Sequence, residues 1–209
     1  ADLMAGGGLS RSRISGVAPR ADDGAPPRID IAFTEKRAQL PVAVVTATKG
    51  VFNAGRDQKE LKPVAVGSSL MVQSYVQTGA DGLALLDLAD GSRLRVERGT
   101  LLLLGQLHLN EALERVVELK LVAGHVSVDV ARRGPKGRFR IKTKHGVAGV
   151  RGTRFRLDLG KGQATRLETL HGKVDLAGSK AKVLVPAGMG SRVDASGVPM
   201  KPRPLAAAP

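Results

Sequence analysis

The sequence predicts an all-β domain, a solenoid-like or sandwich-like stack of short strands joined by Gly-rich turns. The first observation is alternation, because residues 117–121, 126–130 and 139–143 place apolar side chains at every second position, the period of a half-buried strand. The second is spacing, since roughly ten to twelve such segments recur about every 8–12 residues. The third is the presence of 26 glycines, many of them between these segments.

Two local elements stand out within this pattern. Asp90-Gly91 separates the alternating residues 83–88 from residues 94–96, and this dipeptide favours a tight hairpin turn. Residues 107–116 are the one stretch that could form a turn or two of helix, because Asn110 can cap the helix-forming residues that follow it.

A weak internal repeat suggests how the strands are connected. Residues 122–128 resemble residues 169–176, and residues 48–52 are a looser third copy. Each copy has a glycine (Gly124, Gly172 or Gly50) at or just before a strand, where it permits a bend that a Cβ would block. Repeated bend-then-strand units favour stacked coils of β structure, and a sandwich with Gly-rich turns remains an alternative.

Three parts are predicted along the chain. Residues 1–40 are expected to be a disordered N-terminal segment, because they contain Gly6-Gly7-Gly8 and Pro26-Pro27 and show no lasting periodicity. Residues 41–198 form the β domain. Residues 199–209 are proline-rich and are expected to be a disordered C-terminal tail.

Composition excludes several classes of protein. The 209 residues are 42% hydrophobic but only 2% aromatic, so the core has to be built mainly from aliphatic side chains. The absence of cysteine excludes disulfides, Cys-ligated metal centres and a thiol nucleophile. No apolar run approaches the ~18 residues that a membrane helix needs, so we expect no membrane span in this chain.

Most of the positive charge is concentrated in one stretch. The net charge is 33 − 19 = +14, and residues 131–166 hold 12 basic and 1 acidic side chains, a net +11. A field this local indicates an anionic partner or, alternatively, a solvated face.

The alternation predicts how these cations are arranged. Residues 138, 140, 142 and 144 fall on one side of a strand, and residues 154 and 156 repeat the pattern. If the two strands are neighbours, these six cations form one patch. The predicted anion-binding or partner-binding residues are Arg132, Arg133, Lys136, Arg138, Arg140, Lys142, Lys144, Arg154 and Arg156.

No set of residues indicates catalysis, so we expect no enzyme activity, no cofactor and no metal. The chain lacks a G-x-S-x-G elbow and a Cys–His pair. The carboxylates Asp81, Asp87, Asp90 and Glu97 are better explained as turn formers and exposed strand residues. His125 and His171 occupy equivalent repeat positions that stacking could bring together, but isolated histidines are the more plausible interpretation.

Several motifs give the chain a family likeness. Residues 78–94 read TGADGLALLDLADGSRL and residues 150–155 read VRGTRF, with LVAGHV at 121–126 and FRIKT at 139–143 between them. Together they resemble the FecR-like domain, the periplasmic sensor module of iron-dicitrate-type regulators, which also occurs in other bacterial envelope proteins. The matching positions extend over residues 42–195.

The resemblance implies an all-β, solenoid-like domain outside the inner membrane that binds a partner and catalyses nothing. The motif residues Val150, Arg151, Gly152 and Thr153 are interpreted as structural, with Gly152 allowing a positive φ and Thr153 closing the bend. Sigma-regulating members of the family also carry a cytoplasmic helical region and a membrane helix, neither of which is visible here. The protein is expected in the periplasm or cell envelope, exported by a leader that is not visible in this chain.

Three functions follow as hypotheses. The first is a non-enzymatic envelope scaffold that presents a cationic β face to an anionic envelope polymer or an acidic protein partner. The second is the periplasmic signal-relay domain of a transmembrane sigma-factor regulator in iron or siderophore signalling. The third is a nucleic-acid-binding protein, which the scarcity of aromatic residues for base stacking makes unlikely.

Overall fold

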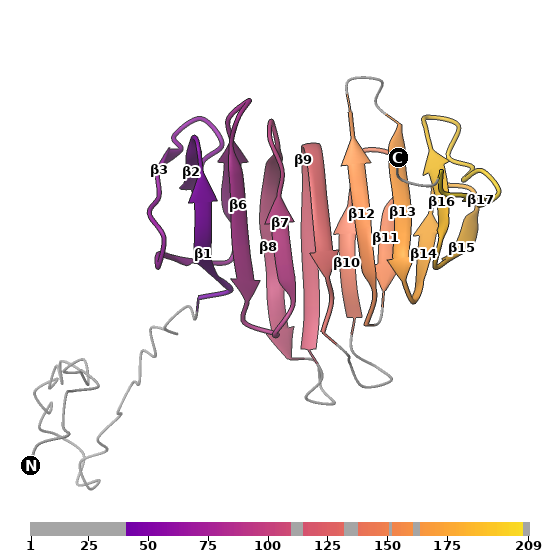
Figure 1. The fold of residues 1–209 in the computed structure, drawn as a ribbon, viewed down its shortest axis with the longest axis horizontal. Coiled ribbons are helices and arrows are strands. Elements are labelled where there is room, and N and C mark those ends of the chain that lie inside the picture. Colours follow the sequence, from indigo (N-terminus) through magenta and orange to yellow (C-terminus); the bar gives the residue numbers. More distant parts are fainter. Residues whose placement is uncertain (1–40, 110–114, 132–137, 151, 161–163, 207–209) are drawn as a thin grey trace, which may run out of the picture. The chain divides into compact units, whose positions relative to one another are not determined.

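The computed structural model describes residues 41–109, 115–131, 138–150, 152–160 and 164–206. Within these ranges the chain forms seventeen β-strands and no helix, which confirms the all-β prediction (Figure 1). Consequently, the described part of the chain has no helix that could cross a membrane. Residues 1–40 lie outside these ranges, so the disordered N-terminal segment stays a prediction.

The strands follow one another closely along the chain. The first eight are β1 (Ala43–Lys49), β2 (Phe52–Gly55), β3 (Lys62–Pro63), β4 (Ser69–Leu70), β5 (Ser74–Thr78), β6 (Leu83–Leu88), β7 (Arg93–Val96) and β8 (Leu101–Leu109). The longest is β9 (Arg115–Asp129). The others are β10 (Arg138–Lys142), β11 (Val147–Val150), β12 (Arg154–Leu159), β13 (Thr165–His171), β14 (Lys173–Ala177), β15 (Lys182–Pro186), β16 (Met189–Val193) and β17 (Arg203–Pro204).

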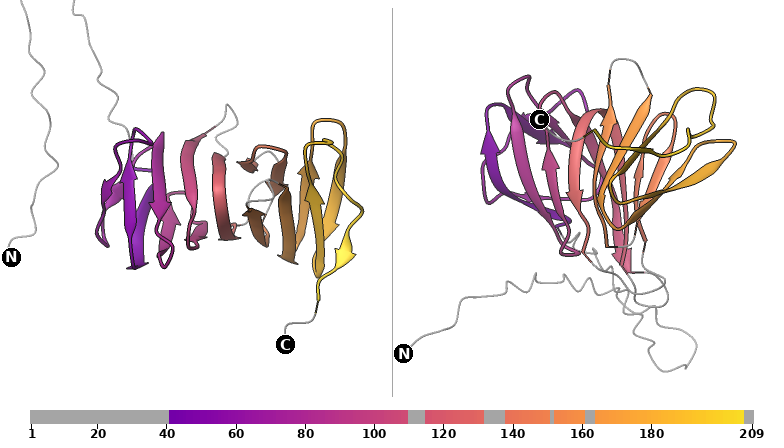
Figure 2. Two further views of the ribbon diagram at one scale, coloured as in Figure 1. Left: turned by 90° about the horizontal axis from the view of Figure 1, so that it is seen from above. Right: turned by 45° about the vertical axis from the view of Figure 1, so that its right-hand side comes forward.

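Strand pairing arranges the chain in two layers that meet in β9 (Figures 1 and 2). Layer A has the order β4-β1-β6-β7-β9-β12-β13-β16-β17. Layer B has the order β3-β2-β5-β8-β9-β10-β11-β14-β15. All of these pairs are antiparallel except β9–β10, which is parallel.

The inward faces of both layers form one apolar core. Alternate residues of each strand are buried, as in β10 with Phe139 and Ile141 and in β12 with Phe155 and Leu157. These side chains belong to a single hydrophobic cluster that includes residues from both layers. Complete burial of each stabilises the fold by about 1.5–3 kcal/mol, so the alternation determines which side of every strand faces solvent.

Glycines with positive φ mark the points where the chain passes between layers. Gly50 lies between β1 and β2, Gly124 lies within β9, and Gly172 lies between β13 and β14, with φ of 64°, 90° and 81°. These are the three glycines of the sequence repeat, so each repeat is a crossing from one layer to the other. Gly99, Gly152 and Gly188 mark the crossings β7–β8, β11–β12 and β15–β16 in the same way.

The helix considered for residues 107–116 is wrong wherever the structure describes that stretch. Leu107 pairs with Val117 and His108 with Val116, so the end of β8 and the start of β9 form an antiparallel ladder. Cross-strand pairing satisfies the backbone groups that a helix would have paired internally. Residues 110–114, which include the proposed cap Asn110, lie outside the described residues.

The predicted disorder of the C-terminal tail is also corrected, for residues 199–206. The amide of Met200 donates to Arg192 O at 2.9 Å, the amide of Leu205 donates to Gly188 O at 2.9 Å, and β17 pairs with β16. The segment covers the edge of layer A, where an uncovered strand would leave backbone groups unpaired.

Replacing Gly124 by Ala should destabilise the domain more than replacing Gly99 by Ala. Both residues have positive φ (90° and 62°), a strain that costs a non-Gly residue about 1–3 kcal/mol. A Cβ at Gly124 would also lie 2.5 Å from Thr100 Cα and 2.7 Å from Gly99 O, whereas a Cβ at Gly99 would meet nothing within 4 Å. Urea unfolding of both variants measures the difference, and equal losses would contradict the close approach at Gly124.

Candidate functional site

The structure does not bring the six predicted strand cations onto one face. The β10 strand pairs with the first half of β9 and with β11 in layer B, whereas β12 pairs with the second half of β9 and with β13 in layer A. The crossing at Gly152 separates the two strands, so their exposed sides belong to different layers. The condition for a single patch, that β10 and β12 are neighbours, is therefore not met.

Two of the β10 cations lie close to one acidic residue of layer B. Lys142 Nζ lies 2.7 Å from Glu118 Oε2, and Arg140 Nη1 lies 3.9 Å from Glu118 Oε1. Arg138 is exposed, and Lys144 follows the end of β10 in a turn. Four residues of the predicted motifs lie outside the described ranges, namely Arg132, Arg133, Lys136 and Arg151.

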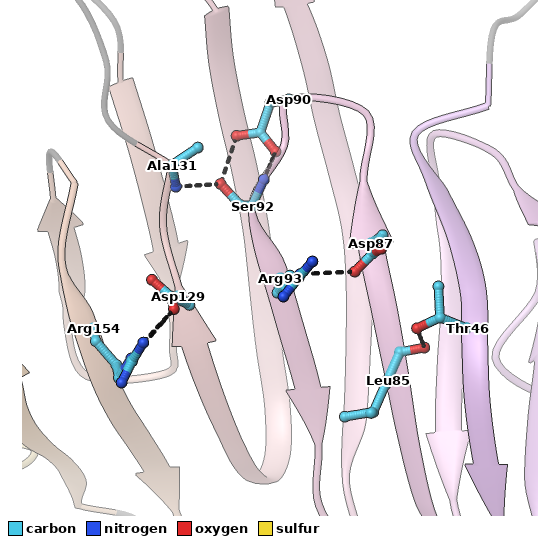
Figure 3. Close-up of polar contacts among 9 residues, drawn as sticks. All are labelled: Thr46, Leu85, Asp87, Asp90, Ser92, Arg93, Asp129, Ala131 and Arg154. Carbon is cyan, nitrogen blue, oxygen red and sulfur yellow. Dashed lines mark hydrogen bonds and ion pairs between the residues drawn. The ribbon is translucent and has the colours of Figure 1, made fainter.

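The cations of β12 are paired with acids on layer A. Arg154 Nη2 donates to Asp129 Oδ2 at 2.8 Å, and Arg156 Nη1 donates to Glu168 Oε2 at 3.4 Å. Figure 3 shows Arg154 reaching from β12 to Asp129 on β9. The two layers therefore present cations in different surroundings.

The second half of layer B carries unbalanced positive charge. From β9 to β15 its described outward side chains include six cations and two acids, 6 − 2 = +4. Lys120 lies directly opposite Lys142 in the parallel ladder, and like charges in that position repel each other. We call this set the cationic face: Lys120, Arg138, Arg140, Lys142, Lys173 and Lys182, with Glu118 and Asp175 among them.

Layer A instead carries a groove in which the charges nearly balance. It has a volume of about 1340 Å³ and is lined by residues of β1, β6, β7, β9, β12 and β13 and of their connections. Its cations are Lys49, Arg93, Arg95, Arg98, Arg154, Arg156 and Arg166, and its acids are Asp81, Asp87, Glu97, Asp129, Asp158 and Glu168. Six of the seven cations are arginines, whereas four of the six on the cationic face are lysines.

The groove charges alternate in sign across the strands. Asp87, Arg93, Asp129 and Arg154 form one cross-strand row on β6, β7, β9 and β12 (Figure 3). Arg93 Nε lies 3.6 Å from Asp87 Oδ1, and Arg154 bonds Asp129. Sequence reasoning missed this row because Asp129 and Arg154 are far from the β6–β7 hairpin in the chain, and only the strand register brings them to it.

Asp90 and Ser92, in the DGS part of the family-like motif, form a structural latch. Asp90 is buried in the β6–β7 turn and accepts hydrogen bonds from the amide of Ser92 at 3.0 Å and from its hydroxyl at 2.8 Å. The amide of Ala131 donates to Ser92 Oγ at 3.1 Å, which ties the turn to the end of β9 (Figure 3). The interpretation of Asp90 as a turn former is confirmed, and the link to Ala131 is additional.

The VRGT motif also contributes to a bend. Gly152 has φ of 64°, and Thr153 is buried. Thr153 O accepts a hydrogen bond from the amide of Val130 at 2.9 Å, which joins this crossing to the end of β9. The positive φ accounts for a glycine at position 152, whereas the buried hydroxyl of Thr153 makes no hydrogen bond within the described part of the chain.

The two histidines at equivalent repeat positions are not brought together. His125 on β9 places Nδ1 2.7 Å from Asp158 Oδ2, whereas His171 lies opposite Arg154 at the end of β13. The described residues contain no group of three or more His, Cys, Asp or Glu side chains that could hold a metal ion.

The fold and its two outer faces define an all-β domain with surfaces of different charge character. Residues 74–175 match the model of the FecR protein family. Residues 74–175 of the chain are therefore similar to the FecR family, which confirms the resemblance drawn from its motifs.

Solved structures give the same fold. Two crystal structures of a candidate anti-sigma factor from Parabacteroides distasonis ATCC 8503 superpose with a TM-score of 0.54 at 13% sequence identity. The match covers 62% of this chain and 59% of that protein, so the chain spans less than two thirds of it. Among curated proteins, no sequence matches.

Replacing Asp90 by Ala should destabilise the domain by about 1–3 kcal/mol, because the buried amide and hydroxyl of Ser92 lose their acceptor. The control is Asp87→Ala, which removes an exposed carboxylate whose contact with Arg93 is 3.6 Å and should change stability by no more than about 0.5 kcal/mol. Thermal and urea unfolding measure both effects. A loss for Asp90→Ala as small as that of the control would show that the latch contributes nothing.

Proposed function

We propose that the chain is the signal-relay domain of a FecR-type regulator, acting by contact with other proteins and not by catalysis. The observation that carries the proposal is the FecR family match over residues 74–175, which include β5 to β13 in full. The fold shared with a candidate anti-sigma factor adds support. The proposal extends to control of a sigma factor, in response to iron or a siderophore.

The proposed compartment is the periplasm or cell envelope, where FecR-type domains typically occur. In such a regulator this domain receives a contact on one face and passes the signal through the protein to which it belongs.

Deleting residues 41–206 from the encoded protein, at its own locus, should change transcription of a small gene set that depends on one alternative sigma factor. The reason is that a relay domain sets the activity of that factor through protein contacts. RNA sequencing measures the change, with the intact gene reinserted at the same locus as control. An unchanged transcriptome, with the shortened protein detected by immunoblot, would contradict the relay role.

A second candidate function is supported by the cationic face of layer B. Lys120 and Lys142 lie opposite each other, and Glu118 is the acid within bonding distance of Lys142 and Arg140. An anionic envelope polymer with repeated phosphates would relieve this repulsion. The domain would then act as a scaffold attached to envelope material through layer B.

Replacing Lys120, Arg138, Lys173 and Lys182 together by Gln should weaken adsorption to purified lipopolysaccharide at least fivefold at low salt. The control replaces Arg93, Arg95, Arg154 and Arg156 by Gln, which removes the same charge from layer A, where each arginine has an acid partner. Cosedimentation measures adsorption. Equal losses in both variants would contradict a specific layer B face, and equally strong binding to duplex DNA would favour the nucleic-acid hypothesis.

A further inference from the structure

The centre of the layer A groove contains a small residue between two arginines. Ser127 on β9 lies directly opposite Arg95 on β7 and directly opposite Arg156 on β12. Adjacent strands are about 4.8 Å apart, so the two arginine Cα atoms stand about 10 Å apart across Ser127. Side chains of arginine length can therefore converge above the serine hydroxyl.

This position differs from its neighbour along β9. Two residues further on, Asp129 stands between Arg93 and Arg154 and binds Arg154 at 2.8 Å. Ser127 is too short to fill the same space, is half-buried, and makes no side-chain hydrogen bond within the described part of the chain. The row of Arg95, Ser127 and Arg156 thus lacks the central carboxylate that its neighbouring row has.

Both arginines retain donors for another acceptor. Arg95 Nε lies 2.7 Å from Glu97 Oε1, and Arg156 Nη1 lies 3.4 Å from Glu168 Oε2. A guanidinium has five N–H donors in a planar fork, so one carboxylate contact leaves others available. The side chains are 53% and 59% exposed, so a partner can reach them.

We propose that the row of Arg95, Ser127 and Arg156 binds a carboxylate carried by an extended segment of a protein partner. The proposal deepens the relay function, on which it rests for the identity of the partner as a protein. The carboxylate accepts hydrogen bonds from both guanidinium groups and from the Ser127 hydroxyl, and it takes the place that Asp129 has in the next row.

The rest of the row specifies the partner segment further. Leu85, 37% exposed, lies opposite Arg95 on the outer side, and Glu168 lies opposite Arg156. From Leu85 to Ser127 and from Ser127 to Glu168 are two strand spacings each, about 9.6 Å. A polyproline II segment repeats its face every three residues, about 9.3 Å. Such a segment can therefore place an apolar residue over Leu85, an acid over Ser127 and a base over Glu168.

The test uses a defined heptapeptide, Leu-Pro-Pro-Glu-Pro-Pro-Lys with blocked ends, titrated into the ¹⁵N-labelled chain at low salt. We expect amide shifts at Ser127 and its neighbours on β7 and β12, with affinity on the order of millimolar for so few contacts. The peptide with Gln in place of Glu should bind at least tenfold more weakly, because it lacks the carboxylate charge.

Variants of the chain locate the site. Ser127→Glu places a carboxylate of the protein itself between Arg95 and Arg156, so it should keep the fold and weaken peptide binding at least tenfold. Ser127→Ala should weaken binding no more than threefold, and Lys173→Gln with Lys182→Gln, on layer B, should leave it unchanged. Thermal unfolding checks that Ser127→Glu remains folded.

Several outcomes would overturn the site: no shifts at 5 mM peptide, equal binding of the Gln peptide, or shifts confined to layer B and lost with Lys173→Gln and Lys182→Gln. If Ser127→Glu fails to fold, Arg95→Gln with Arg156→Gln provides the same test by removing the donors. The relay function is tested separately by transcription in cells. Peptide binding without any transcriptional effect would support the site and contradict the relay function. A transcriptional effect without peptide binding would support the relay function and contradict the site.

Discussion

The structure depends on glycines that let the backbone cross between layers in tight contact with the preceding crossing. A Cβ at Gly124 would lie 2.5 Å from Thr100 Cα, and a Cβ at Gly172 would lie 2.6 Å from Thr153 Cγ2. These two crossings thus pack against a buried threonine of an earlier one, Thr100 and Thr153, a contact that only a residue without a side chain permits. Because every crossing changes the layer, these glycines determine which strands become neighbours and which side chains share an outer face.

The crossings separate the chain's cations into two environments. Layer A holds arginines beside carboxylates, as with Arg154 and Asp129, whereas layer B holds a lysine-rich face in which Lys120 and Lys142 lie opposite each other. Arginine offers a planar fork for directional pairing, and lysine is a strongly hydrated point charge. Layer A, where the charges nearly balance, therefore presents a surface suited to directional pairing, and layer B, with its excess of cations, presents one suited to diffuse attraction of polyanions.

Local pattern was sufficient to predict the strands but not their neighbours. Alternation correctly identified buried residues such as Phe139 and Phe155, because period two follows from strand geometry alone. Whether β10 lies beside β12 depends on a crossing between them, and one crossing moves a whole strand to the other layer. The groove row depends on register among β6, β7, β9 and β12, which no local signal encodes. At Asn110 a capping signal was considered, yet the flanking residues pair as strands because cross-strand partners outweigh local propensity.

The alternating charges of layer A are poorly explained by stability. Exposed ion pairs such as Arg93 with Asp87, with side chains 80% and 50% exposed, contribute at most about 1 kcal/mol. Such pairs do, however, hold arginine side chains near fixed positions on a rigid sheet, which reduces the entropy lost when a partner binds. Because each internal pair is weak, a carboxylate from a partner can share an arginine with its internal acid at little cost in free energy. Contact made in this way is specific in geometry and reversible in strength, which suits the proposed relay function.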